Sequence, residues 1–320
     1  MRLQNASPTV ARWPEAEPHS PKWGLSRSRP PCSTALVVLV LSWSLLILPS
    51  LGVGGGWAFA ELPRPSAADI AACVRDPGCH RTFVVAHRAK GFGAPENSRA
   101  AVARAVAAGV PIVGISVRAS SDDEMFVLHD RDLRRETTLQ GRIDEVPAAR
   151  LAQALLKNGE PLPRFSDLYA LVRGRAVLTV GFKVDLVSRL ADWIHAHGSF
   201  DDVIFFVNRG EQMQAAARAK GRYPEMMVMV RLLDTRVTVE STKAVFGRLP
   251  EILHTDPLGA KQVSDLQAQG GKVFMNVLRS ERLVPPLNSL AIRRVLGTRP
   301  DFVQTDEPVR LMHRVATNGR

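Results

Sequence analysis

The sequence predicts an α/β fold, a (β/α)8 TIM barrel, and three observations lead to this prediction. Short apolar segments alternate with helical segments about eight times over roughly 230 residues. Most apolar segments are rich in Val, Ile, Phe and Met without polar alternation, as expected for strands buried on both faces. Several helical segments are followed by Gly, a common helix terminator. A doubly wound open sheet is the alternative, but no G-x-G-x-x-G follows the first strand.

The individual elements follow from this alternation. Strands are expected at Phe83–His87, Ile112–Arg118, Met125–His129, Ala176–Val184, Val203–Asn208, Met226–Arg231, Glu251–His254, Val273–Val277 and Phe302–Thr305. Helices are expected at Asn97–Ala108, Leu186–His197, Gln212–Lys220, Thr235–Arg248, Ala260–Ala268 and Leu287–Leu296, with Gly109, Gly198 and Gly221 as terminators. Only Ser120–Glu124 separates the second and third strands, too short for a helix, so these strands should form a hairpin. Residues 131–164 then form a small insertion with short helices.

The amino-terminal part of the chain has a different character from the rest. No charged residue occurs from Pro30 to Ala60, and residues 35–49 have the composition of the apolar region of a signal peptide. Ala58 and Ala60 fit a cleavage site for small residues. A retained membrane anchor through residues 35–60 is the alternative. We therefore expect a signal peptide or anchor at 1–60, one barrel domain at 61–320, and an extracytoplasmic location, periplasmic or secreted.

The cysteines agree with an oxidising compartment. Cys73 and Cys79 flank Asp76-Pro77-Gly78, a strong turn sequence. This arrangement favours a local disulfide. The alternative is a metal site, for which only His80 offers a nearby third ligand.

The composition limits the classes of partner. Apolar residues make up 45% and charged residues 23%, as in ordinary globular proteins. The 42 basic and 31 acidic residues give a formal charge of +11. These charges are scattered and aromatic residues are only 6%, which argues against nucleic-acid binding. A positive field suits a small phosphate-bearing substrate or an anionic membrane surface.

Candidate catalytic residues stand where the predicted strands end. His87 ends the first strand and His129 ends the hairpin strand. Function in a (β/α)8 barrel collects at the carboxyl ends of the strands. Two histidines there suit general acid and base catalysis near neutral pH.

Several motifs resemble those of the glycerophosphodiester phosphodiesterases. AHRAKGFGAPENS (residues 86–98) is similar to their A-H-R-G and P-E-N-T, and VLHDRDLRRETTLQG (residues 127–141) to their V-x-H-D-x-x-L-x-R-x-T segment. LPRFSDL (residues 162–168) and FVQTDEP (residues 302–308) resemble the later I-P-T-L-x-E-x-L and T-D-x-P motifs. The resemblance runs in consistent order from about Phe83 to His313.

The resemblance implies a barrel fold and hydrolysis of a glycerophosphodiester to an alcohol and glycerol phosphate. His87 and His129 match the family's acid and base. Arg88, Lys183 and Arg118 would hold the phosphate, while Glu96 and Asn97 would position the first loop. Members of the family also use a divalent cation, often Ca²⁺ or Mg²⁺.

The sequence departs from the family at the positions of the metal ligands. Gly114 and Ser116 occupy the places of E-x-D, and Gly181 occupies the place of the Glu in E-x-K. A hard divalent cation needs oxygen ligands, preferably charged ones. Glu96, Asp130 and Asp185 are the remaining nearby carboxylates, but their spacing does not make them a replacement set. We therefore expect no metal unless the family's dependence on Ca²⁺ or Mg²⁺ survives.

Two functions remain open at this stage. In the first, the chain is a phosphoric diester hydrolase acting on glycerophosphodiesters or phospholipid headgroups, with Arg118 replacing the cation. Bacterial phosphatidylinositol-specific phospholipases C, a distantly similar barrel family, use an arginine in this way. In the second, the chain is an inactive extracytoplasmic module that binds a phosphate or lipid headgroup. The retained histidines favour the enzyme, and glycine at two ligand positions favours the binder.

Overall fold

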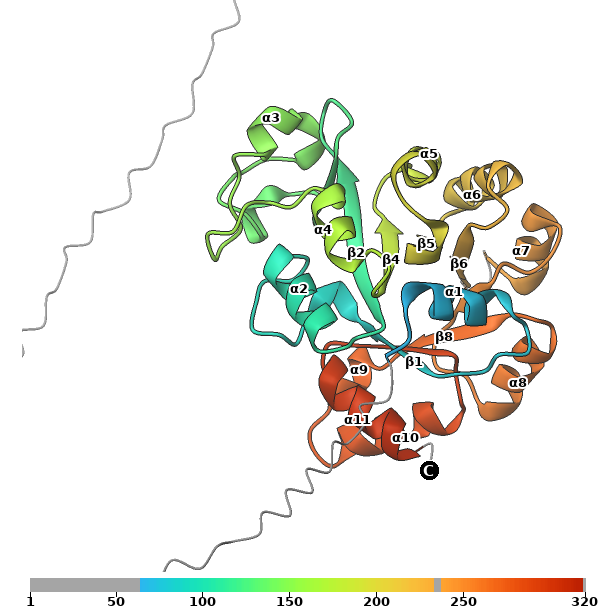
Figure 1. Ribbon diagram of the computed structural model, residues 1–320. Helices are drawn as coiled ribbons and strands as arrows, with labels where there is room; N and C mark the ends of the chain where they lie inside the picture. The colour runs from blue at the N-terminus through green and yellow to red at the C-terminus, as the bar shows by residue number, and fades with distance from the viewer. Residues whose placement is uncertain (1–63, 233–236, 319–320) are drawn as a thin grey trace, which may run out of the picture. The chain divides into compact units, whose positions relative to one another are not determined.

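The computed structural model describes residues 64–232 and 237–318. The predicted segment 1–60 lies outside these residues. The described part of the chain forms the expected closed barrel (Figure 1). Its sheet has the order β1-β9-β8-β7-β6-β5-β4-β2-β3, and an additional pairing between β1 and β2 closes the ring. No helix within the described ranges is long and apolar enough to cross a membrane.

Eight parallel strands form the barrel, and β3 pairs antiparallel with β2. The strands are β1 (Phe83–Ala86), β2 (Ile112–Ala119), β3 (Met125–Val127), β4 (Val177–Phe182), β5 (Val203–Val207), β6 (Met227–Arg231), β7 (Ile252–His254), β8 (Lys272–Asn276) and β9 (Phe302–Thr305). Val85 lies opposite Ile112, and Ala86 opposite Val113, where the ring closes. Val117 lies opposite Val127 in the predicted hairpin.

Helices surround the ring and connect its strands. They are α1 (Ala67–Arg75), α2 (Arg99–Ala107), α3 (Ala148–Leu151), α4 (Phe165–Val172), α5 (Val187–His197), α6 (Gly210–Arg222), α7 (Val239–Phe246), α8 (Ala260–Ala268), α9 (Leu278–Glu281), α10 (Leu287–Gly297) and α11 (Pro308–Asn318). Short 3-10 turns are η1 (His87–Ala89), η2 (Leu133–Arg135), η3 (Ile143–Glu145) and η4 (Phe200–Asp202). The expected insertion contains η2, η3 and α3.

Side chains on alternate strand positions divide the apolar core into two parts. Inward-facing residues such as Val85, Ile112 and Phe274 fill the barrel. Outward-facing residues such as Val113 and Val180 pack against the surrounding helices. Because the interior is packed with side chains, a ligand can reach it only at the ends of the strands.

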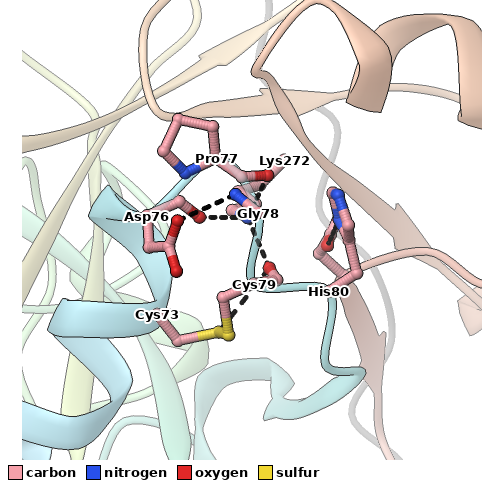
Figure 2. The surroundings of a disulfide bond; sticks show 8 residues. Cys73, Asp76, Pro77, Gly78, Cys79, His80 and Lys272 are labelled. Carbon is pink, nitrogen blue, oxygen red and sulfur yellow. Dashed lines mark hydrogen bonds and ion pairs between the residues drawn. A yellow bond between two sulfur atoms is a disulfide. The ribbon is translucent and has the colours of Figure 1, made fainter.

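Helix α1 covers the amino-terminal end of the barrel. Ile70, Ala71 and Val74 are buried in the same cluster as Phe83 and Phe302 of the interior. Cys73 of this helix forms the predicted disulfide with Cys79, in the loop that follows (Figure 2). This helix was not among the elements expected from the sequence, the first of which was the strand at Phe83.

A buried lysine fastens the disulfide loop to the sheet. Lys272 of β8 is only 2% exposed. Its Nζ donates to the carbonyl oxygens of Asp76, at 2.7 Å, Pro77 and Cys79 (Figure 2). Burial lowers the pKa of Lys272, while nearby Asp301 and Asp76 oppose this shift. The three carbonyl oxygens compensate for the loss of water around the ammonium group.

Several boundaries differ from the sequence predictions, most by one or two residues. Gly221 does not end a helix, because α6 continues to Arg222. Pro224 is the physical stop, since it disfavours a helical conformation at Tyr223, whose φ of −127° and ψ of 79° are not helical. Helix α7 starts at Val239 with Thr238 as its N-cap, later than the expected start at Thr235.

We predict that Lys272→Met lowers the free energy of unfolding by about 2 kcal/mol, because it removes the ammonium donor that three carbonyl oxygens of the disulfide loop share and leaves only Asp76 O with another donor, the backbone N–H of Cys79. Denaturant unfolding measures the change. Lys261→Met is the matched control: Lys261 lies on α8, its side chain is 87% exposed, and its replacement should change stability by less than about 0.5 kcal/mol. Equal effects of the two substitutions would contradict the structural role of Lys272.

Candidate active site

The closure of the ring brings the predicted site residues to one end of the barrel. His87 follows β1 directly, and β1 pairs with β2. Farther along the same edge of β2, the backbone N–H of Leu128 donates to the carbonyl oxygen of Ser116 at 2.9 Å. This edge lies opposite β4 and pairs first with β1 and then with β3. Both histidines therefore lie along one edge of β2, toward its carboxyl end.

His87 is held by a carboxylate from the last strand. Its Nδ1 lies 2.7 Å from Oδ1 of Asp306, which follows β9. Burial alone would raise the pKa of Asp306, but the hydrogen bond from His87 and the charges of His87 and Lys90 lower it below its usual value. An ionised carboxylate can only accept a hydrogen bond, so Nδ1 carries the proton. The Nε2 atom of His87 remains for a ligand.

His129 has the same kind of partner. Its Nδ1 lies 2.7 Å from Oδ1 of Asp130. Burial is the main cause of the low pKa of His129, about 4; the charges of Lys183 and Arg88 act in the same direction, and Asp130 opposes them. The imidazole is therefore neutral at ordinary pH. Nδ1 donates to Asp130, and Nε2 keeps a free electron pair.

Arg118 holds the backbone next to His129. Its Nε and Nη2 donate to the carbonyl oxygen of His129 at 2.9 and 2.7 Å. Burial lowers the pKa of the Arg118 guanidinium. The sequence predicts that Arg118 binds phosphate, whereas these two bonds give it a visible role in positioning His129.

Glu96 connects the two histidine loops. Its side chain is only 11% exposed and accepts from Arg88 at 2.9 Å and from Arg135 at 2.8 Å. Lys90 lies 3.4 Å away. Burial acts to raise the pKa of Glu96, but the hydrogen bond from Arg135 and the charge of Arg88 outweigh it and lower the pKa to about 2. The carboxylate thus joins the loop after β1 to η2 of the insertion.

The loop after β1 has a constrained backbone. Arg88, Ala89 and Asn97 have φ values of 53°, 55° and 60°, in the left-handed region that non-glycine residues rarely adopt. Asn97 is buried, and its Oδ1 accepts from the backbone N–H of Ser116 at 3.3 Å. Such strained conformations persist where the surroundings fix them, and they cluster at functional sites. This hydrogen bond links the loop after β1 to β2.

The positive charge of Lys183 has no partner within the described part of the chain. Lys183 follows β4, and its ammonium group makes no hydrogen bond or ion pair with any residue in the described ranges. Burial lowers its pKa to about 8, and the positive charges of Arg88, Arg118 and Arg209 act in the same direction. A half-buried, unpaired ammonium group beside other cations is a candidate site for an anion.

The residues present do not fit the family's metal. Gly114, Ser116 and Gly181 stand on the inward face of β2 and β4, where the family has carboxylates. A Cβ at Gly181 would make only ordinary contacts, 3.5 Å from Ile115 O, so a lack of space does not explain the glycine. No group of three His, Cys, Asp or Glu side chains in the described ranges is placed to hold a metal ion.

The three carboxylates considered as replacements have other surroundings. Glu96 is paired with arginines, and Asp130 is bound to His129 and Arg135. The hydrogen bond from Arg135 is the largest influence on Asp130 and lowers its pKa. Asp185 is exposed. The carboxylates at this end of the barrel thus serve to hold histidines and arginines.

The structure adds three residues to the predicted set: Asp306, Asp130 and Arg135. All three lie within the motifs TDEP and HDRDLRRET, which carried the resemblance. The motifs locate these residues in the sequence, but the bonds from Asp306 to His87 and from Arg135 to Glu96 join segments far apart in the chain.

The comparisons agree with this picture. Residues 87–186 match the sequence model of the Glycerophosphoryl diester phosphodiesterase family. The resemblance predicted from the motifs is thereby confirmed for this part of the chain, which includes both histidine loops. A comparison with curated protein sequences gave no match.

Solved structures establish the fold. A glycerophosphoryl diester phosphodiesterase from Parabacteroides distasonis has a TM-score of 0.66 at 17% identity, covering 79% of this chain and 92% of its own. A glycerophosphodiester phosphodiesterase from Agrobacterium tumefaciens has a TM-score of 0.60 at 22% identity, covering 71% and 97%. A phosphodiesterase from Oleispira antarctica, in complex with the product sn-glycerol-3-phosphate, has a TM-score of 0.59 at 22% identity, covering 73% and 96%.

Proposed function

We propose that this chain is a phosphodiesterase that hydrolyses glycerophosphodiesters or related phospholipid headgroups by histidine acid–base catalysis without a metal ion. The observation that carries the proposal is the pair of imidazoles at one end of the barrel, each with its Nδ1 bound to a carboxylate. Both Nε2 atoms are free for proton transfer. Unpaired Lys183 lies within electrostatic reach of His129.

The two histidines have different roles in the proposed reaction. Neutral His129 removes a proton from the attacking water, whose oxygen forms the new bond to phosphorus. His87, as an imidazolium stabilised by Asp306, donates a proton to the leaving alcohol as its bond to phosphorus breaks. An alcohol and glycerol phosphate result, and one proton has moved from His87 to His129. Acid and base catalysis of this kind contributes about 10²- to 10⁴-fold each.

The phosphate is bound by the protein's own cations. Lys183 supplies a point charge to the non-bridging oxygens, and Arg88 supplies guanidinium N–H donors beyond the one bound to Glu96. Such fixed donors stabilise the charge that builds up on these oxygens during attack. Arg118 acts through His129, whose carbonyl oxygen it binds.

The proposed reaction takes place outside the cytoplasm. The uncharged run from Pro30 to Ala60 supports export, and the disulfide between Cys73 and Cys79 suits an oxidising compartment. Glycerophosphodiesters and lipid headgroups are both substrates that such a compartment can offer.

We predict that the full chain hydrolyses a glycerophosphodiester and that His87→Ala and His129→Ala each lower kcat by about 10²- to 10⁴-fold, because each removes one proton transfer. Release of glycerol phosphate measures turnover. His195→Ala is the control, since His195 lies on α5 and packs on Tyr223. Equal turnover by all four proteins would disprove the catalytic assignment. Tight phosphate binding with no turnover would instead identify a binding module.

Removal of metal should leave this activity unchanged. The residues at Gly114, Ser116 and Gly181 provide no set of charged oxygen ligands, so the reaction should proceed in excess EDTA and should not be stimulated by Ca²⁺ or Mg²⁺. Initial rates with and without chelator measure this. Loss of turnover in chelator that added Ca²⁺ restores would show that the family's metal dependence survives.

The pH dependence of kcat/KM should reflect two lowered pKa values. His129 must be neutral, so kcat/KM falls as pH decreases through about 4. Lys183 must be charged, so kcat/KM also falls as pH increases through about 8. Lys183→Arg keeps the positive charge at alkaline pH and should remove the part of the alkaline loss that comes from Lys183, while the need for a protonated His87 acts on both proteins alike. Superimposable alkaline limbs for the wild type and Lys183→Arg would show that Lys183 does not bind the substrate.

A further inference from the structure

An apolar segment is exposed at the start of α10. We call residues 282–290 the apolar segment. Leu283, Val284, Leu287 and Leu290 are 44, 69, 53 and 60% exposed. They account for four of the six large exposed apolar side chains in the described ranges. Single exposed apolar residues are normal on a protein surface, but a group of this kind marks an interaction site.

The apolar segment lies at the catalytic end of the barrel. It follows α9, which begins directly after β8, and the carboxyl ends of the parallel strands all face this way. The side chain of Glu281, at the end of α9, accepts from Thr305 Oγ1 and, at 3.0 Å, from the backbone N–H of Asp306. Asp306 in turn binds His87. Two hydrogen bonds therefore connect the base of this segment to a proposed catalytic histidine.

The surroundings of the segment are positively charged. Arg279, Arg282, Arg293 and Arg294 are exposed on α9, on α10 and between them. Glu281 is the one acidic residue from 278 to 300, and its carboxylate is bonded to Thr305 and Asp306. Exposed apolar side chains flanked by arginines are typical of surfaces that enter the headgroup region of an anionic bilayer.

We propose that the apolar segment docks the protein on an anionic lipid bilayer, with its leucine and valine side chains inserted among the headgroups. This inference rests on the proposed function and narrows its substrate to headgroups presented at a membrane. Val309, at the start of α11 and 39% exposed, stands at the same end of the barrel. Figure 1 shows α9, α10 and α11 grouped together below the barrel.

Charge decides between a bilayer and a second copy of the chain. Two copies meeting through this surface would bring eight arginines together without acidic partners. An anionic bilayer instead attracts each of them. The arginines also have long aliphatic chains that can lie along the apolar region while their guanidinium groups reach lipid phosphates.

The test uses the full chain with vesicles of phosphatidylglycerol or of phosphatidylcholine. Hydrogen exchange of residues 282–290 reports on the apolar segment itself, separately from any binding of vesicles by the amino-terminal run. We expect slower exchange there with phosphatidylglycerol, less with phosphatidylcholine, and a decrease in binding as salt increases. The double variant Val284→Ser, Leu287→Ser should bind roughly a hundredfold more weakly, about tenfold for each side chain lost from the bilayer.

A matched control separates local docking from a general loss of apolar surface. Leu155→Ser changes an exposed leucine, 40% accessible, in the insertion that follows α3, across the barrel from α10 in Figure 1. It should leave vesicle binding unchanged. Both variants should hydrolyse a water-soluble glycerophosphodiester like the wild type. Similar losses of vesicle binding in both would overturn the proposal.

Three other results would also overturn docking. The first is unchanged exchange in residues 282–290 when vesicles bind. The second is protection that rises with protein concentration without lipid, which would indicate a second copy. The third is protection without lipid that disappears when residues 30–60 are deleted, which would show that this run covers the segment. Because exchange does not depend on turnover, an inactive chain that docks would refute only the proposed catalysis.

Discussion

The pairing of β1 with β2 is the interaction on which the site depends. It closes the sheet into a ring and sets the end of β1 beside Gly114 of β2. One edge of β2 thus supports His87 through β1 and, farther along, His129 through the hairpin. Without this pairing the motifs would remain separate features of the sequence, because no local interaction connects their histidines.

The electrostatics of the site follow from three missing carboxylates. In this chain the inward positions of β2 and β4 carry no negative charge at Gly114, Ser116 and Gly181. Lys183 consequently remains unpaired, and its positive charge helps to keep His129 neutral. The absence of carboxylates at these positions therefore leaves an unpaired cation within electrostatic reach of a neutral imidazole. The free charge of Lys183 and the neutral state of His129 both suit the proposed reaction.

The sequence was informative where the structure obeys local rules. The barrel, the hairpin and the disulfide each follow from periodicity, spacing or turn residues. The end of α6 was misplaced because Gly221 looked like a terminator, whereas Pro224 has the stronger steric effect. Asp306 as the partner of His87 could not be predicted, since the pairing depends on contact between the first and last strands. Arg118 had the expected position on β2, but its bonds to the carbonyl of His129 depend on how the hairpin folds back.

Helix α1, which covers the amino-terminal end of the barrel, limits the routes by which a substrate can reach the site. The helix packs on the interior residues at that end, and the disulfide joins it to the loop that Lys272 binds. Because α1 covers the opposite end and side chains fill the interior, a substrate and both of its products can reach or leave the histidines only from the carboxyl ends of the strands. A molecule with long hydrocarbon tails could present its polar head there while its tails stay in the surrounding phase.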